Sequence, residues 1–220
     1  MRNALVIGAS GGIGAAVAAA LTSRSVDVVP LSRRADGMDL TEAASVERVM
    51  AGLSGPFDLI LIATGVLASA GCRPEKSLAE IDAGAMARVM AINAIGPALI
   101  LRHVPRLLPR RGRSVVAVLT ARLGSIGDNA LGGWYSYRAS KAAANQIVRT
   151  SAIEIGRRHK DAIVVALHPG TVATTFTKDY PGHRKVAPEL AAANLLGVIE
   201  GLTAEDNGGF RDWEGNAVQW

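Results

Sequence analysis

The chain is poor in cysteine, histidine and aromatic residues, and each scarcity excludes a class of protein. Its 220 residues include one cysteine, four histidines and three each of Trp, Tyr and Phe. A single thiol excludes an intramolecular disulfide framework. The histidines lack the spacing of metal ligands, so we expect no metal site. These residues are Cys72, His103, His159, His168 and His183.

A charged leader and a long apolar run are also lacking. The chain does not begin with a positively charged segment followed by an apolar stretch, and we find no run long enough to span a bilayer. We therefore expect a soluble, cytoplasmic protein with no membrane partner. Positive charge is in modest excess, with 24 Lys and Arg against 19 Asp and Glu.

One dense basic patch raises the question of nucleic-acid binding. The patch lies between an apolar helical segment and an apolar strand, a position that favours a solvated loop. We therefore expect no nucleic-acid partner, and a phosphate-bearing cofactor accounts for some of the remaining positive charge. The patch consists of Arg106, Arg110, Arg111 and Arg113.

Short apolar runs alternate with longer helical patterns along the chain. The apolar runs cover residues 4–7, 26–31, 59–63, 115–119 and 163–167, and a last short strand falls within 209–220. The helical patterns cover residues 12–23, 41–53, 78–108, 134–158 and 188–202. Continuous apolar runs suit strands buried on both faces, and strand–helix alternation predicts right-handed crossovers. We expect an α/β fold: a single Rossmann-type domain over residues 1–220, whose doubly wound parallel sheet is flanked by helices on both faces. Segments 71–76 and 178–186 combine Gly, Pro and charge, and each is either a flap over a site or an ordinary surface loop.

A glycine-rich loop stands between the first strand and the first helix. Glycines let the backbone approach a ligand closely, and the first N–H groups of a helix attract an anion. The loop predicts a site for a dinucleotide pyrophosphate, although a glycine-rich turn without a ligand has the same sequence. Residues 8–12 also match a serine nucleophile elbow, which we reject because too little chain precedes them to build its sheet. The expected cofactor residues here are Gly8, Ser10, Gly11, Gly12, Ile13 and Gly14.

The second strand predicts which dinucleotide is bound. It is followed by Arg33 and Arg34, where a carboxylate would otherwise hold the ribose hydroxyl of NAD. Because the guanidinium fork suits a phosphate, we expect NADP(H) to be favoured over NAD(H). Asp39 is expected to accept from the adenine amino group, with Leu40 beside it. The alternative is a solvated arginine pair on a loop.

Tyr137 and Lys141 are four residues apart and therefore share one face of a helix. A free tyrosine has a pKa of about 10, and a nearby ammonium group lowers it. A tyrosine tuned in this way acts as a general acid or base near neutral pH. The alternative is an amphipathic surface pair.

Taken together, these motifs resemble the short-chain dehydrogenase/reductase family over nearly the whole chain. The glycine loop matches the cofactor loop of the family, Tyr137 and Lys141 match its catalytic pair, and Asn93 matches its N-x-x-G motif. Segments 124–129 and 132–138 look like the C-factor and sniffer-type carbonyl reductase branch. The resemblance implies further cofactor residues, namely Ala63, Gly65, Pro169, Gly170, Val172 and Thr174.

The resemblance also implies a mechanism. Tyr137 would protonate the carbonyl oxygen of a small aldehyde, ketone or quinone while NADPH delivers hydride to the carbon. Lys141 would lower the pKa of Tyr137 and hold the nicotinamide ribose, and the Asn93 main-chain carbonyl would hold a water. Because Pro97 has no N–H, the Asn93 carbonyl lacks its ordinary helical partner, although a simple proline kink has the same geometry. Long helices bearing Asn93 and Tyr137 would form a homodimer or homotetramer.

Two motifs depart from the family pattern. Ala121 stands where the family has a serine that polarises the substrate oxygen. Neighbouring strand residues point to opposite faces, so the Thr120 hydroxyl is expected to face away, and Ser125 is the candidate replacement. Residues 62–65 replace the usual Asn-Asn-Ala-Gly, and the short segment between residues 34 and 57 predicts a trimmed strand–helix unit.

These observations support two functional hypotheses. The first is an NADPH-dependent reductase acting on a small-molecule carbonyl or alcohol substrate. The second is an NADP(H)-binding sensor or signalling protein with little turnover, which the missing serine and the C-factor resemblance favour. Retention of Asn93, Tyr137 and Lys141 favours the enzyme, because cofactor binding alone does not require the tyrosine.

Overall fold

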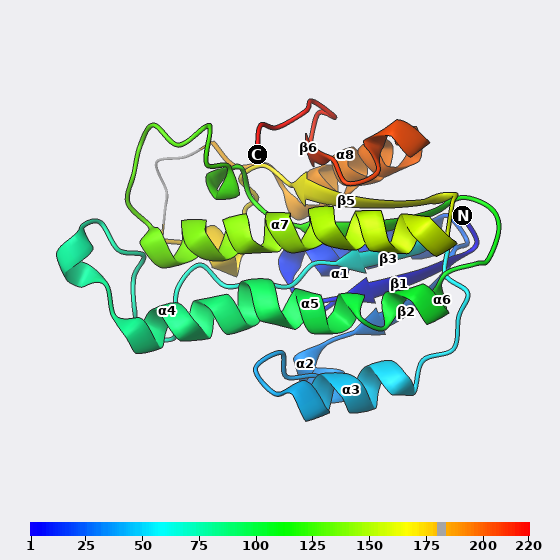
Figure 1. Ribbon diagram of the computed structural model, residues 1–220, viewed down its shortest axis with the longest axis horizontal. Coiled ribbons are helices and arrows are strands. Elements are labelled where there is room, and N and C mark those ends of the chain that lie inside the picture. Colours follow the sequence, from blue (N-terminus) through cyan, green and yellow to red (C-terminus); the bar gives the residue numbers. More distant parts are fainter. Residues whose placement is uncertain (180–183) are drawn as a thin grey trace.

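The computed structural model describes residues 1–179 and 184–220, whose strands form one parallel six-stranded sheet in the order β2-β1-β3-β4-β5-β6 (Figure 1). Strand β3, Leu59–Ile62, is fully buried, as continuous apolar runs predict. The expected α/β fold is confirmed, including the short last strand. The strands are β1 (Asn3–Ile7), β2 (Asp27–Leu31), β3 (Leu59–Ile62), β4 (Ser114–Leu119), β5 (Ala162–His168) and β6 (Phe210–Asp212).

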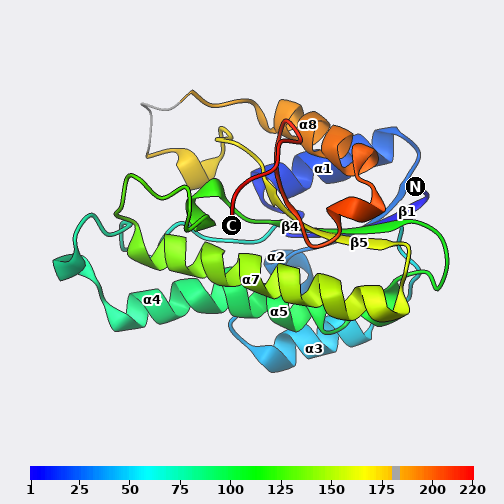
Figure 2. The same cartoon turned by 45° about the horizontal axis from the view of Figure 1, so that its top comes forward.

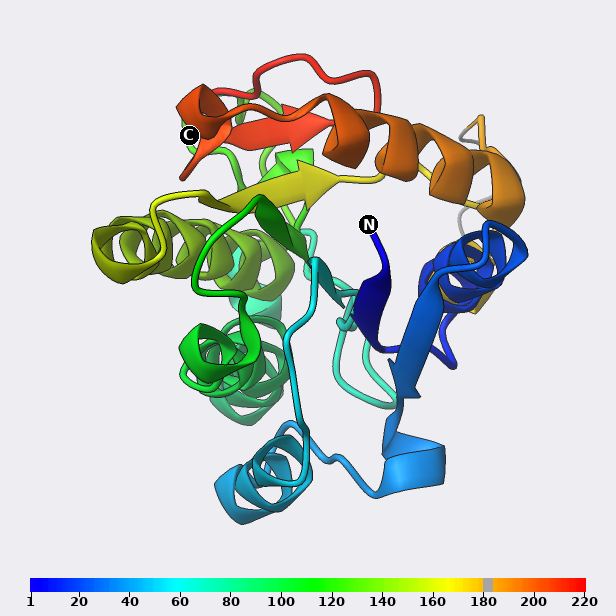
Figure 3. The ribbon, with the colours of Figure 1, turned by 90° about the vertical axis from the view of Figure 1, so that its right-hand side faces the viewer.

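Helices cover both faces of the sheet and bury one apolar cluster against each. Figure 3 shows the orange α8 and the blue α1 on one side, and the green and yellow-green helices α5 and α7 on the other. Figure 2 shows α7 lying alongside α4 and α5, which follow each other end to end. The helices are α1 (Gly12–Ser23), α2 (Arg33–Asp36), α3 (Ala43–Ala51), α4 (Ala83–Met90), α5 (Gly96–Leu101), α6 (Val104–Leu107), α7 (Tyr135–Arg158) and α8 (Pro188–Gly201).

The helical pattern expected over residues 78–108 is not one regular helix, because it is interrupted at residues 81–82 and 102–103 and widened between α4 and α5. A 3-10 turn covers Leu78–Glu80, and α4 begins only after Asp82, whose carboxylate accepts from the Ala85 N–H at 2.7 Å. Between α4 and α5 lies a wide π-helical turn, η2 (Ala91–Ile95), in which the Gly96 N–H donates to the Ala91 carbonyl. The wide turn immediately precedes Pro97, and inserted turns of this kind recur at functional sites.

The helical run from Ala83 to Leu101 is long and apolar enough to cross a membrane by length and composition, contrary to expectation. A core helix of a globular fold passes the same test. Here the run packs against α7, and Val89, Ala94 and Ile100 are buried. We therefore interpret the run as a core helix.

The short connection between β2 and β3 holds α2 and α3 in place of a further strand–helix unit, as expected from its length. The Ser32 hydroxyl accepts from the Ala35 N–H and caps α2. This arrangement brings α2 to the carboxyl end of β2, next to the glycine loop, because the Gly8 N–H donates to the Leu31 carbonyl at 2.8 Å.

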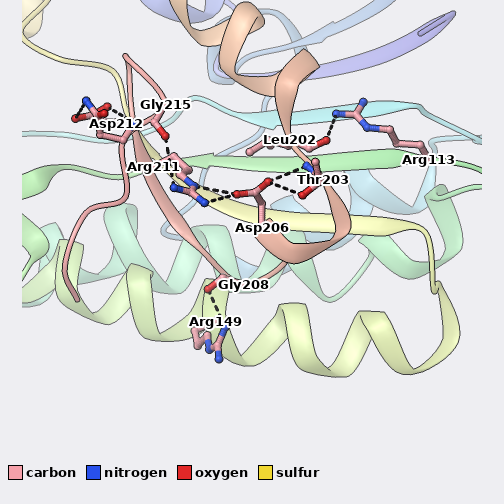
Figure 4. A network of polar contacts seen from close by, with 10 residues as sticks. Arg113, Arg149, Leu202, Thr203, Asp206, Gly208, Arg211, Asp212 and Gly215 are labelled. Atoms are coloured by element: carbon pink, nitrogen blue, oxygen red, sulfur yellow. Dashed lines mark hydrogen bonds and ion pairs between the residues drawn. The ribbon is translucent and has the colours of Figure 1, made fainter.

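Charged side chains fasten the last strand to the rest of the fold (Figure 4). The Asp206 carboxylate accepts from Arg211 and from the Thr203 N–H. Arg149, on α7, donates to the Gly208 carbonyl at 3.1 Å. The ion pair between Asp206 and Arg211 and the hydrogen bond from Arg149 hold β6 beside β5. The carboxyl end of β5 borders the site.

Candidate active site

A cavity of about 1120 Å³ lies at the carboxyl ends of the parallel strands. This edge is where doubly wound sheets bind their ligands. The glycine loop, the ends of β3, β4 and β5, and the first turns of α7 line the cavity. Three buried polar atoms of the lining residues have no hydrogen-bond partner among the described residues. They are Thr64 Oγ1, Thr120 Oγ1 and His168 Nδ1.

The glycine loop turns tightly enough to expose the first N–H groups of α1. Gly8 has a φ of +94°, and a Cβ on Gly14 would lie 2.8 Å from the Gly8 carbonyl carbon. Helix α1 has Gly11 as its N-cap and no side-chain cap, so its first donors remain open to an anion. A Cβ on Gly12 would clash with the Thr174 side chain, which lies against the loop and also lines the cavity. These residues fit a dinucleotide pyrophosphate.

Tyr137 and Lys141 lie on successive turns of α7, and both line the cavity while remaining buried. The Lys141 Nζ lies 5.9 Å from the centre of the Tyr137 ring and donates to the Leu119 carbonyl at 3.0 Å. Burial lowers the pKa of Lys141 to about 8. Burial raises the pKa of Tyr137 above its ordinary value, so the net shift is opposite in direction to the expected lowering.

Asn93 lies behind the cavity wall instead of lining it. Its side chain donates to the Val66 carbonyl and accepts from the Val66 N–H, each at 2.8 Å. Gly65 lies between Asn93 and Lys141, since a Cβ there would be 3.3 Å from Asn93 Oδ1 and from Lys141 Nζ. The amide therefore fixes the chain after β3, and only the main-chain carbonyl remains as the candidate water ligand.

The structure does not bring Ser125 into the cavity. This residue is buried, and its hydroxyl accepts from the Asp128 N–H at 3.1 Å, which corrects the expectation that it replaces the missing serine. Ala121 and Thr120 both belong to the lining, but the Thr120 oxygen is buried. His168 ends β5 beside them, and burial lowers its pKa to about 4, so its ring is neutral at pH 7.

The residues expected to hold the adenosine end lie outside the main cavity. Arg33 and Arg34 are exposed on α2, and neither forms an ion pair within the described residues. The Asp39 carboxylate accepts from the Thr41 hydroxyl and N–H, and these bonds hold its pKa below the ordinary value. Leu40 points into the core against Gly96, so its side chain is unavailable to a ligand.

The segment after β5 lines the cavity opposite α7. It contributes Pro169, Gly170, Val172 and Thr174, while Ala63 and Gly65 line the cavity from the end of β3. The second suggested flap, 178–186, falls partly outside the described residues. The first, 71–76, is anchored by Glu75, whose carbonyl accepts from the Trp134 N–H.

Two aromatic contacts to Tyr137 were not predicted from the sequence. The Trp134 and Phe176 rings each lie edge-on to the Tyr137 ring, with centroids 6.1 Å away. Phe176 comes from the segment after β5, so no local spacing relates it to Tyr137. The three rings make this part of the cavity apolar.

The fold, the glycine loop and the α7 pair define a dinucleotide-binding α/β protein. A family model of the short chain dehydrogenases matches residues 2–185. The 1-hydroxy-2-glutathionyl-2-methyl-3-butene dehydrogenase of Rhodococcus sp. (strain AD45) is 37% identical over 237 aligned residues, covering 100% of both chains. The C-signal of Myxococcus xanthus is 38% identical over 170 residues, covering 76% of this chain and 95% of its own. The structure of NADPH-bound carbonyl reductase from chicken fatty liver matches with a TM-score of 0.86 and 25% identity, covering 100% of this chain and 99% of that one.

The chain therefore belongs to the short-chain dehydrogenase/reductase family and is an NAD(P)-dependent oxidoreductase. The similarity to C-signal and to a carbonyl reductase confirms the resemblance to the C-factor and carbonyl reductase branch.

Proposed function

We propose that this protein is an NADPH-dependent carbonyl reductase, one domain over residues 1–220, in which Tyr137 donates the proton. One observation carries the proposal: Tyr137 and Lys141 are buried in the wall of the same cavity that the glycine loop opens. The similarity to an NADPH-bound carbonyl reductase supports NADPH as the cofactor. A phosphate group of the cofactor beside the exposed Arg33 would also be favourable, because the guanidinium fork matches the geometry of a phosphate.

The bound dinucleotide would supply hydride for the carbonyl carbon. Burial keeps Tyr137 protonated at neutral pH, so its hydroxyl donates the proton to the carbonyl oxygen, which becomes the alcohol. The Lys141 ammonium then stabilises the phenolate left behind, since opposite charges attract strongly in a buried site. The first N–H groups of α1 hold the pyrophosphate, and the Asn93 carbonyl holds a water for reprotonation.

Ala121 supports a second candidate function. No hydroxyl occupies its position, and the similarity to C-signal adds a protein named for signalling. The alternative is a sensor that binds NADP(H) with little turnover. Removing one oxyanion donor costs about 10² to 10³ in rate in other enzymes, so slow turnover is also expected of the reductase.

The substrate class and the assembly belong to the same proposal. The Rhodococcus relative is named for a hydroxylated, glutathionyl-bearing compound, so we infer a small-molecule alcohol or carbonyl substrate. The assay measures hydride transfer in both directions. Ile95 on η2 and Ile153 on α7 are half-exposed, which favours a homodimer or homotetramer through these helices. We infer a cytoplasmic location, because the proposed reaction draws on an intracellular pool of NADPH.

The test follows NADPH absorbance with a panel of aldehydes, ketones and quinones, and NADP⁺ with the matching alcohols. Tyr137→Phe is expected to lower turnover by about 10² or more, because it removes the proton donor. Tyr135→Phe is the matched control, since Tyr135 lies two residues before Tyr137 on α7 and outside the cavity lining. Tight NADPH binding without turnover on any substrate would favour the sensor, and equal activity of both variants would refute the role of Tyr137.

A further inference from the structure

The segment that follows β3 is bonded along its length to η2, to α4 and to the start of α7. Its beginning is held by the two hydrogen bonds between Val66 and Asn93. Its middle is held by Arg88 of α4, whose Nε donates to the Ser69 hydroxyl at 2.7 Å. The segment is therefore fixed to η2 and to α4 before it reaches Glu75.

Glu75 bonds to the first turn of α7 with both its main chain and its side chain. Its carbonyl accepts from the Trp134 N–H at 2.5 Å. Its carboxylate accepts from the Ser136 N–H at 3.2 Å and from the Ser136 hydroxyl. Only 7% of Glu75 is exposed. Burial alone would raise its pKa, but the hydrogen bonds from Ser136 and from the Glu75 backbone together outweigh burial and hold the pKa below its ordinary value, so the group is ionised.

Helix α7 has no cap of its own. Its N-cap residue is Trp134, in the left-handed region at φ 54°, and no side-chain cap bond forms there. By contrast, α2 and α4 are capped by Ser32 and Asp82. A carboxylate is favourable at the positive end of a helix, and Glu75 supplies one from a segment 61 residues away in the chain.

We propose that Glu75 is a positioning residue for Tyr137: its buried carboxylate caps α7 and fixes the turn that carries the proton donor. Tyr137 directly follows Ser136, so a shift of the first turn moves its hydroxyl relative to the cavity. The Trp134 ring, which packs edge-on against Tyr137, is held by the same residue through its N–H. This inference rests on the proposed function of Tyr137.

The first experiment measures the position of Tyr137 without any turnover. The chain has three tyrosines, so the protein labelled with 3-fluorotyrosine has three fluorine resonances, and Tyr137→Phe assigns one of them. Glu75→Ala is expected to shift or broaden the Tyr137 resonance. The matched control is Asp82→Ala, which removes a carboxylate cap from α4, and it is expected to leave that resonance in place.

The second experiment separates turnover from cofactor binding. We expect Glu75→Ala to lower kcat by about 10- to 100-fold, the usual effect of misplacing a catalytic group by about 1 Å. The Kd for NADPH should change much less than kcat, because the glycine loop precedes α1 and is not part of the first turn of α7. Glu75→Gln, which retains an acceptor for Ser136, should recover part of kcat and serves if Glu75→Ala does not fold.

The results distinguish the two proposals. If the wild-type protein has no turnover, the fluorine measurement still decides the role of Glu75. The positioning role is overturned if the Tyr137 resonance of every folded Glu75 variant matches that of Asp82→Ala. It is also overturned if an active protein keeps the same kcat in those variants.

Discussion

Replacing Gly14 by alanine tests the claim that the glycine loop is shaped by backbone contact. A Cβ at this position would lie 2.8 Å from the Gly8 carbonyl carbon and closer still to the carbonyl oxygen. Real Cβ atoms essentially never approach other atoms below 3.0 Å, so the turn must open. Overpacking of this kind costs about 1–3 kcal/mol, while the change from Gly to Ala within a helix returns about 0.5–1 kcal/mol. The net expectation is a loss of up to about 2.5 kcal/mol in the free energy of unfolding.

Gly197→Ala is the matched control for this experiment. Gly197 also lies inside a helix, α8, but a Cβ there would have no atom of the described residues within 4 Å beyond its own turn of helix. The control should therefore gain about 0.5–1 kcal/mol, and the two alanines should change stability in opposite directions. For a chain of this size, 1 kcal/mol corresponds to about 2–4 °C in Tm.

Urea unfolding of the protein without ligand measures both values, and NADPH titration follows. Gly14→Ala should weaken NADPH binding as well, because the displaced turn no longer presents the first N–H groups of α1 to the phosphates. Gly197→Ala should bind NADPH as the wild type does. A Gly14→Ala protein that is as stable as Gly197→Ala would refute the reasoning from backbone contact.

Three further predictions address the chemistry of the site. Ala121→Ser should raise kcat by up to about 10²-fold, because it restores a donor to the substrate oxygen, and an unchanged steady-state rate would contradict this reading. Arg33→Ala should raise the KM for NADPH by about tenfold or more and leave the KM for NADH unchanged, whereas Arg24→Ala, in an exposed pair with Glu200, should change neither. His168 has a folded pKa of about 4 against an ordinary value of 6.5, so between these values the unfolded state binds the extra proton and stability falls as the pH falls. His168→Gln should therefore lose less stability than the wild type between about pH 7 and about pH 5 in urea unfolding, and parallel losses would contradict the prediction.

The sequence alone predicted the features that depend on local spacing. Strands buried on both faces are continuous apolar runs, so all five long strands and the last short one were found in order. The glycine loop and the pair Tyr137 and Lys141 were predicted for the same reason, since a turn and a helical repeat are set by neighbours in the chain. The trimmed strand–helix unit between β2 and β3 was predicted from the small number of residues in that connection.

Tertiary structure decided the features that depend on distant partners. Ser125 turned away from the cavity because its hydroxyl binds Asp128, and the pKa of Tyr137 rose because the surrounding fold buries it. The helix predicted over 78–108 broke at Asp82 and at the wide turn before Pro97, where apolar periodicity gives no signal. Glu75 meets Ser136 across 61 residues, and no spacing in a sequence reports a contact that only folding creates.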